Sequence, residues 1–153
     1  MTTRCHVHEE AFDASPETLF ALLTTPSAIR DWWSASRVIV VARAGGSWAA
    51  TWGADEDHPD YVTSATMSEF DPPRRMVLCD YRYQAASGAL PFDAEFVTSF
   101  EVRASEGGAV LRVEQDGFPL GEAADEFLAG CETGWRDTFA GIRRCLASRD
   151  ATR

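Results

Sequence analysis

The sequence predicts an α+β fold in which a curved antiparallel sheet of about six or seven strands wraps around one long C-terminal helix. Three features lead to this prediction: a long C-terminal segment with helical periodicity, a series of short strand-like segments before it, and turn sequences that join those segments. Strands joined by such short turns pair as antiparallel neighbours. We therefore expect any ligand site to lie between the sheet and the long helix.

The long helix is expected over residues 122–147. Its apolar residues recur at intervals of three and four, which places them on one side of a helix: Leu128, Cys131, Trp135, Phe139, Ile142 and Leu146. Acidic residues gather at the start of the segment and arginines at its end, as the helix dipole favours. A side that carries two large aromatic rings needs a broad surface to pack on, and the sheet supplies one.

The rest of the chain is predicted to form strands and two short helices. Residues 4–12 alternate loosely and predict the first strand. Ser15 and Pro16 suit the cap and first position of one helix, and Pro26 stands at the head of a second helix that ends near Trp33. Further strands are expected at residues 37–43, 47–52, 61–70, 74–83, 94–104 and 109–115.

Length and charge restrict the class of protein. A chain of 153 residues predicts a single domain. It has no run of eighteen apolar residues and no signal peptide, so we expect a cytoplasmic protein without a membrane partner. The net charge of −10 argues against nucleic acid as a partner. The four cysteines form no C-x-x-C motif and are expected to be buried free thiols.

We expect neither a cofactor nor a metal ion. The sequence contains no P-loop, no dinucleotide-binding glycine fingerprint and no G-x-S-x-G motif. His6, His8 and Glu10 form an H-x-H-x-E row, and alternate residues of a strand point to the same face. No fourth ligand is indicated, and on the outer face of the sheet the row would be solvent-exposed.

Four stretches of the sequence form a pattern in a particular order. They are the opening from Phe12 through Ser15-Pro16-Glu17 to Trp32-Trp33, the turn Gly45-Gly46-Ser47-Trp48, the segment from Glu69 to Leu78 around Pro72-Pro73, and Gly134-Trp135. Together they resemble the family named after the activator of the heat shock protein 90 ATPase, within the START-like (SRPBCC) superfamily. The sequence departs from this pattern at Asp80, where many relatives have a tryptophan.

The resemblance implies the helix-grip fold and a range of functions. The superfamily includes carriers of hydrophobic ligands, aromatic polyketide cyclases, hormone receptors and co-chaperone domains. The eukaryotic co-chaperone joins such a domain to a second one, for which this chain has no room. We therefore do not expect a chaperone partner. A homodimer formed through a sheet edge or a helix is compatible with the sequence.

The expected wall of the ligand site follows from strand alternation and from the helical stripe: Trp48, Trp52, Met67, Phe96, Thr98, Phe100, Leu111, Val113, Leu128, Cys131, Trp135 and Phe139. The strand at residues 74–83 allows two choices. Either Met76, Leu78, Asp80 and Arg82 point inward, or Val77, Cys79, Tyr81 and Tyr83 do. The family pattern favours the first choice, which adds Met76, Leu78 and Asp80 to the wall.

On that choice Asp80 would face an apolar chamber. A carboxylate buried without a partner either protonates or finds a partner. Asp80 is therefore the candidate general base or ligand acceptor. The alternative is an ion pair between Asp80 and an arginine near the end of the sheet, with no role in chemistry.

Three functions remain open at this point. The first is binding of a small hydrophobic or aromatic ligand in a cavity between the sheet and the long helix, without catalysis. The second is an enzyme of the cyclase, dehydratase or hydrolase type that uses Asp80 as acid or base. The third is a stress-related or co-chaperone-like interaction module, which would have a filled core and an exposed binding patch.

Overall fold

A seven-stranded antiparallel sheet and one long helix dominate the computed structural model, which describes residues 2–151 and the side chains of residues 2–149. The elements follow in the order β1 (Arg4–Phe12), α1 (Pro16–Thr24), α2 (Pro26–Trp33), β2 (Arg37–Val40), β3 (Ser47–Trp52), β4 (Tyr61–Asp71), β5 (Arg75–Ala85), β6 (Val97–Ser105), β7 (Gly108–Phe118) and α3 (Glu122–Ala151). The strands lie in the order β1-β7-β6-β5-β4-β3-β2. The predicted α+β helix-grip architecture is confirmed.

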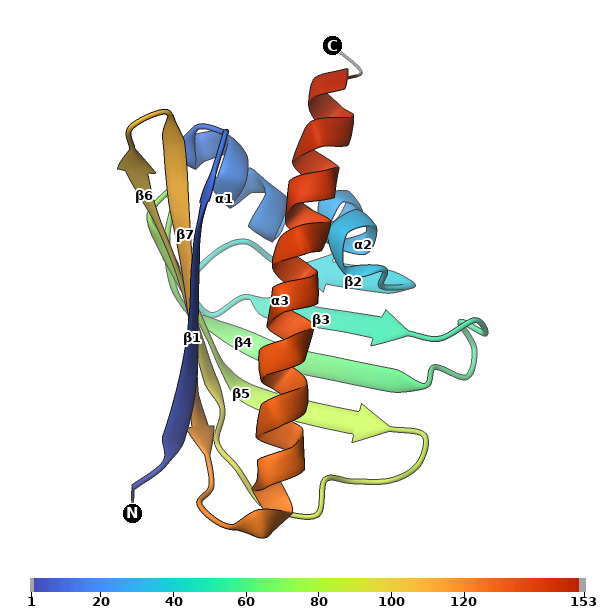
Figure 1. The fold of residues 1–153 in the computed structure, drawn as a ribbon. Coiled ribbons are helices and arrows are strands. Elements are labelled where there is room, and N and C mark those ends of the chain that lie inside the picture. Colours follow the sequence, from blue (N-terminus) through green and yellow to red (C-terminus); the bar gives the residue numbers. More distant parts are fainter. Residues whose placement is uncertain (1, 152–153) are drawn as a thin grey trace.

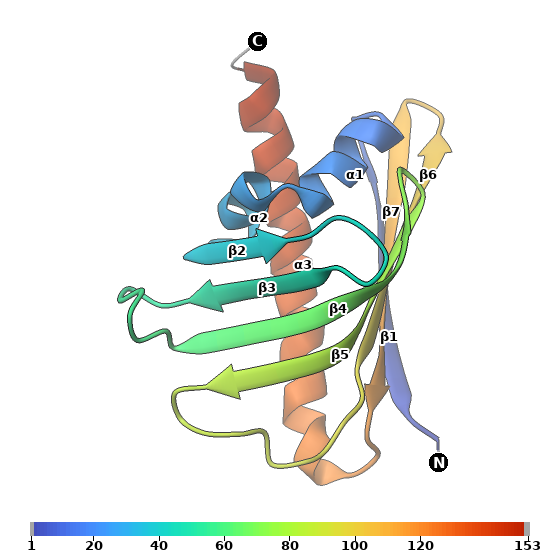
Figure 2. The same ribbon diagram turned by 180° about the vertical axis from the view of Figure 1, so that it is seen from behind.

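The helices cover one face of the sheet. Figure 1 shows α3 crossing that face, with α1 and α2 beside its C-terminal half. Figure 2, seen from behind, shows the opposite face without a helix in front of it. We call the face toward α3 the inner face and the opposite one the outer face. Within the described residues, no helix combines the length and the apolar character needed to cross a membrane.

Local sequence explains how the two short helices begin and how they are held together. The hydroxyl of Ser15 accepts a hydrogen bond from the backbone N–H of Thr18 at 3.2 Å, which caps α1 as predicted. Trp32 then ties α2 to α1, because its indole N–H donates to the carbonyl oxygen of Leu22 at 2.9 Å. The same turn of α2 contacts α3 closely, since a Cβ at Gly141 would lie 2.2 Å from the carbonyl oxygen of Trp32.

The core lies between the inner face, α1, α2 and the C-terminal half of α3. Its fully buried residues include Leu19, Ile29, Met67, Leu111 and Ile142. The four cysteines are free thiols, as expected, but they do not share one environment. Cys145 is buried whereas Cys5 is exposed, so the expectation of burial was wrong for Cys5. Cys5 stands on the outer side of β1, the edge strand of the sheet.

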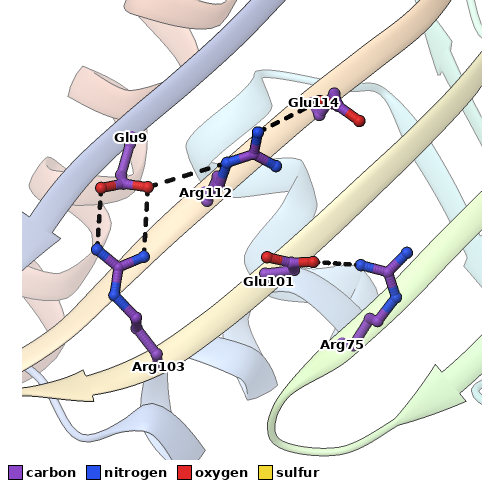
Figure 3. Close-up of polar contacts among 6 residues, drawn as sticks. All are labelled: Glu9, Arg75, Glu101, Arg103, Arg112 and Glu114. Atoms are coloured by element: carbon purple, nitrogen blue, oxygen red, sulfur yellow. Dashed lines mark hydrogen bonds and ion pairs between the residues drawn. The ribbon is translucent and has the colours of Figure 1, made fainter.

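A row of alternating charges crosses part of the outer face. In the strand register Glu9 lies opposite Arg112, Arg112 opposite Glu101, and Glu101 opposite Arg75, which makes one row across β1, β7, β6 and β5. Figure 3 shows the ion pairs of this row and of its neighbours. Glu9 also binds Arg103 at 2.9 Å, and Arg75 is hydrogen-bonded to Glu101. Opposite charges on neighbouring strands attract and remain hydrated, so this face is suited to water.

Candidate ligand pocket

A pocket of about 670 Å³ lies between the inner face and the N-terminal half of α3. Strands β3, β4 and β5, the loop of residues 86–96 and α3 provide most of its wall. Nine of its nineteen lining residues are aromatic: Trp33, Trp52, Tyr61, Tyr81, Tyr83, Phe92, Phe96, Phe127 and Trp135. The remaining ones are Thr63, Leu90, Pro91, Gln115, Ala123, Glu126, Gly130, Cys131, Gly134 and Thr138.

A bulge in β5 decides which of its side chains face the pocket. Cys79 lies opposite Thr66 and Arg82 opposite Ser64, so β5 has one more residue than β4 between these pairs. Asp80, in this stretch, has a φ of 54°, in the left-handed region. The extra residue reverses the alternation of the strand, because successive side chains point to opposite faces.

Because of the bulge, the first of the two predicted inward faces of β5 is correct before it, and the second is correct after it. Met76 and Leu78 before the bulge are buried in the core, whereas Tyr81 and Tyr83 after it line the pocket. Asp80 is exposed and does not line the pocket. The prediction that Asp80 points into the chamber was therefore wrong, and Arg82 is exposed as well.

Four of the predicted wall residues line the pocket: Trp52, Phe96, Cys131 and Trp135. Most of the others are buried in the core instead: Trp48, Met67, Met76, Leu78, Thr98, Phe100, Leu111, Val113 and Phe139. Leu128 is half-buried outside the lining. From Phe139 onward α3 packs against β1 and α2, and the pocket lies along its preceding turns.

Sequence reasoning missed several wall residues. On α3 the pocket side passes through Phe127, one position before the predicted Leu128, and continues through Cys131, Gly134 and Thr138. These steps of three and four residues are also helical, so Phe127 fitted the periodicity as well as Leu128 did. The loop of residues 86–96 had an apolar run, Leu90-Pro91-Phe92, which was the available signal for its role in the wall.

Two groups of aromatic rings stand at different parts of the wall. In one group Trp33 lies edge-on to Trp52, with ring centroids 4.9 Å apart, and 6.1 Å from Trp135. The indole N–H of Trp52 also donates to the carbonyl oxygen of Trp33 at 3.1 Å. In the other group Phe127 contacts Phe92 and Phe96, each at a centroid distance of 5.6 Å. Mutual contacts of this kind hold the aromatic rings of the wall in place.

Two titratable groups of the wall stay neutral near pH 7. Burial raises the pKa of Tyr81, and its hydroxyl hydrogen-bonds to the hydroxyl of Thr98 at 2.9 Å. Burial, with a smaller effect of the Glu132 charge, raises the pKa of the Cys131 thiol to about 11. A protonated thiol is a poor nucleophile, so Cys131 contributes bulk rather than reactivity.

Gln115 joins the pocket to a pair of histidines on β1. Its Oε1 lies 2.8 Å from Nε2 of His6 and 3.3 Å from the indole nitrogen of Trp135. The His6 and His8 rings meet edge to face at 5.1 Å. Burial lowers the pKa of both histidines, which favours their neutral forms.

The two histidines of the H-x-H-x-E row therefore lie on the inner face of the sheet, toward α3. His6 is buried and His8 is half-buried, whereas Glu10 is exposed and lies 3.4 Å from Arg143. The residues that the structure describes contain no group of three or more His, Cys, Asp or Glu side chains placed to hold a metal ion.

Comparisons with known proteins agree with this architecture. The model of the family described as "Activator of Hsp90 ATPase homolog 1-like protein" matches residues 13–147. A protein of Mesorhizobium loti is 21% identical with a TM-score of 0.77, over 95% of this chain and 98% of its own. One of Rhodobacter sphaeroides is also 21% identical, with a TM-score of 0.74 over 95% and 99%.

A further similar structure is CalU16 from Micromonospora echinospora, at 16% identity and a TM-score of 0.70 over 94% of this chain and 74% of its own. At these identities the likeness concerns the fold alone. A search among curated proteins found no match.

Proposed function

The chain belongs to the family of Activator of Hsp90 ATPase homolog 1-like proteins, and from its pocket we propose that it binds a small apolar or aromatic molecule between the sheet and α3. The observation that carries the proposal is the wall itself, in which nine aromatic side chains surround about 670 Å³. Ligand pockets commonly have volumes of this order and mainly apolar walls with few polar groups. An aromatic molecule in this space would remove its own surface and that of the rings from water.

The geometry gives the other two functions less support. The enzyme hypothesis depended on Asp80, which is exposed at the β5 bulge and does not line the pocket. The interaction-module hypothesis required a filled interior, whereas the N-terminal half of α3 stands over a hollow. The outer face, with its charged row, offers the hydrated surface described above rather than an apolar patch.

A fluorescent neutral probe, N-phenyl-1-naphthylamine, tests the proposal. We expect its emission to rise on titration with the protein and the tryptophan emission to fall, because Trp33, Trp52 and Trp135 line the pocket. Phe127→Ala removes a central ring of the wall and should weaken binding by about fivefold or more.

Phe70→Ala is the matched control. Phe70 is half-buried and contacts Phe20 at 5.8 Å, away from the pocket. This substitution should lower stability without a comparable change in probe affinity. Absence of probe binding, or an equal loss of affinity in both variants, would contradict the proposal.

A further inference from the structure

The hydrogen bonds around Gln115 define how its side-chain amide is oriented. An indole N–H only donates, so the Gln115 atom that lies 3.3 Å from Trp135 must be the carbonyl oxygen Oε1. The amide nitrogen of Gln115 then lies on the other branch of the side chain. In the described part of the chain, this nitrogen has no hydrogen-bond partner, and Gln115 lines the pocket.

His6 accepts the orientation that Trp135 sets, provided that its Nε2 carries the proton. Its Nε2 lies 2.8 Å from the same Oε1, which can only accept, so this nitrogen must carry the proton. The other ring nitrogen, Nδ1, is buried without a partner among the described residues, as suits the bare lone pair of that tautomer. Two donors from different elements, α3 and β1, thus hold one oxygen of a residue of β7.

The charged residues of the pocket wall determine which ligand charges the pocket can accept. Glu126 is the one charged side chain among the described residues that line the pocket, and it is exposed. No arginine or histidine of the wall is available to pair with an anion. The hydroxyl of Tyr81 is already hydrogen-bonded to Thr98. A ligand carboxylate or sulfonate would therefore enter an aromatic space without a cation, which is unfavourable.

We propose that Gln115 selects neutral aromatic ligands that carry a hydrogen-bond acceptor oxygen, such as a ring carbonyl, by donating its side-chain N–H to that oxygen. The inference rests on the proposed function and adds to it the class of ligand and the residue that recognises it. His6, which lies outside the pocket lining, acts as a positioning residue, whereas Trp135 both orients the amide and lines the pocket. The aromatic wall accepts the ring system, and the amide distinguishes ligands of the same shape.

A pair of ligands that differ in one oxygen tests this selection. Flavone has a ring carbonyl that flavan lacks, and each can be titrated by displacement of N-phenyl-1-naphthylamine. We expect the wild-type protein to bind flavone about fivefold more tightly than flavan, as one additional hydrogen bond allows.

Two substitutions at Gln115 separate selection from folding. Gln115→Glu keeps an oxygen for Trp135 and His6 and replaces the donating nitrogen by an acceptor. Gln115→Met keeps the length of the side chain and removes both polar groups. Both should reduce the preference for flavone to about onefold, since neither side chain offers a donor near pH 8. Gln84→Glu, the same change at an exposed site of β5 outside the wall, should keep the wild-type preference.

A second probe pair tests the charge limit. 8-Anilinonaphthalene-1-sulfonate has the same ring skeleton as N-phenyl-1-naphthylamine and carries a sulfonate in addition. We expect it to bind at least about tenfold more weakly than N-phenyl-1-naphthylamine. Equal affinity for the two probes would overturn the restriction to neutral ligands.

The outcomes of these titrations separate the two proposals. Equal binding of flavone and flavan by the wild-type protein, or a preference that persists in both Gln115 variants, would overturn the selection by Gln115. Probe binding in that case would leave the proposed function standing. Absence of binding by every compound would overturn both.

Discussion

Trp135 donates its indole N–H to Oε1 of Gln115 across 3.3 Å, and this bond connects α3 to β7 where the pocket meets the core. Trp135 also lies 5.8 Å from Phe100 and 6.4 Å from Phe139, both of which are core residues. The Trp135 side chain is therefore packed against the core on one side and lines the pocket on the other. Orientation of the pocket amide and stability of the fold depend on the same side chain.

Trp135→Phe should lower the free energy of unfolding by about 1 kcal/mol more than Trp33→Phe does, because only Trp135 gives up a hydrogen bond of its indole nitrogen. Both variants replace an indole by a phenyl ring in the same pocket wall, and the loss of the hydrogen bond comes in addition to the packing that each gives up. Urea unfolding followed by circular dichroism measures it. Equal losses in the two variants would show that the bond adds nothing to stability.

Two glycines of α3 should respond in opposite ways to alanine. A Cβ at Gly134, which lines the pocket, would meet nothing within 4 Å, so Gly134→Ala should raise the free energy of unfolding by up to about 1 kcal/mol through helix propensity. A Cβ at Gly141 would lie 2.2 Å from the carbonyl oxygen of Trp32. Gly141→Ala should therefore lower the melting temperature despite the same gain in propensity, and a rise would contradict the close packing of α2 on α3.

Asp80 should behave as a backbone position and not as a catalytic residue. Its φ of 54° suits glycine, so Asp80→Gly should keep or raise the free energy of unfolding, whereas Asp80→Val should lower it by about 1–2 kcal/mol. Thermal unfolding of both variants, with Arg82→Val as a control at an exposed site of the same strand, measures the difference. Equal losses of stability in Asp80→Gly and Asp80→Val would contradict the view that the backbone conformation at residue 80 determines the effect of a substitution there. Asp80→Asn should leave probe binding unchanged.

The limits of sequence reasoning follow from such local features. Periodicity was sufficient to predict α3 and most of the strands, because their buried apolar residues recur at the spacing of a helix or of a strand. The bulge was not predictable, since aspartate can adopt the left-handed region but, unlike glycine, does not indicate it in a sequence. The position of the pocket depends on how closely α3 is packed along its length. Gly141 permits the close approach of α2 and Gly134 lines the pocket, yet both are simply glycines in the sequence.

Stability should fall between pH 7.5 and 5.5 through the histidines of β1. Burial lowers the pKa of His6 and His8 in the folded protein below 6.5, so the unfolded chain binds protons first as the pH falls. The contribution of the neutral rings is present above pH 6.5 and is lost below it. His8→Phe should reduce the fall in melting temperature over this range, because phenylalanine binds no proton. An unchanged slope in His8→Phe would contradict this account.

Cys131 should react slowly with iodoacetamide at pH 7, because burial and Glu132 raise its pKa to about 11. Exposed Cys5 provides the comparison within the same molecule. Peptide mass spectrometry after timed labelling measures both rates. Saturation with N-phenyl-1-naphthylamine should slow the labelling of Cys131 further and leave Cys5 unaffected. Protection of neither cysteine would place the probe outside the pocket.

A crystal structure of the protein with flavone would show both where the ligand binds and how it is oriented. We expect flavone in the pocket, among the rings of Trp33, Trp135 and Phe127, with its carbonyl oxygen about 3 Å from the side-chain nitrogen of Gln115. Flavone bound outside this pocket would contradict the proposed function. Flavone inside it with the carbonyl turned away from Gln115 would contradict the selection by the amide alone.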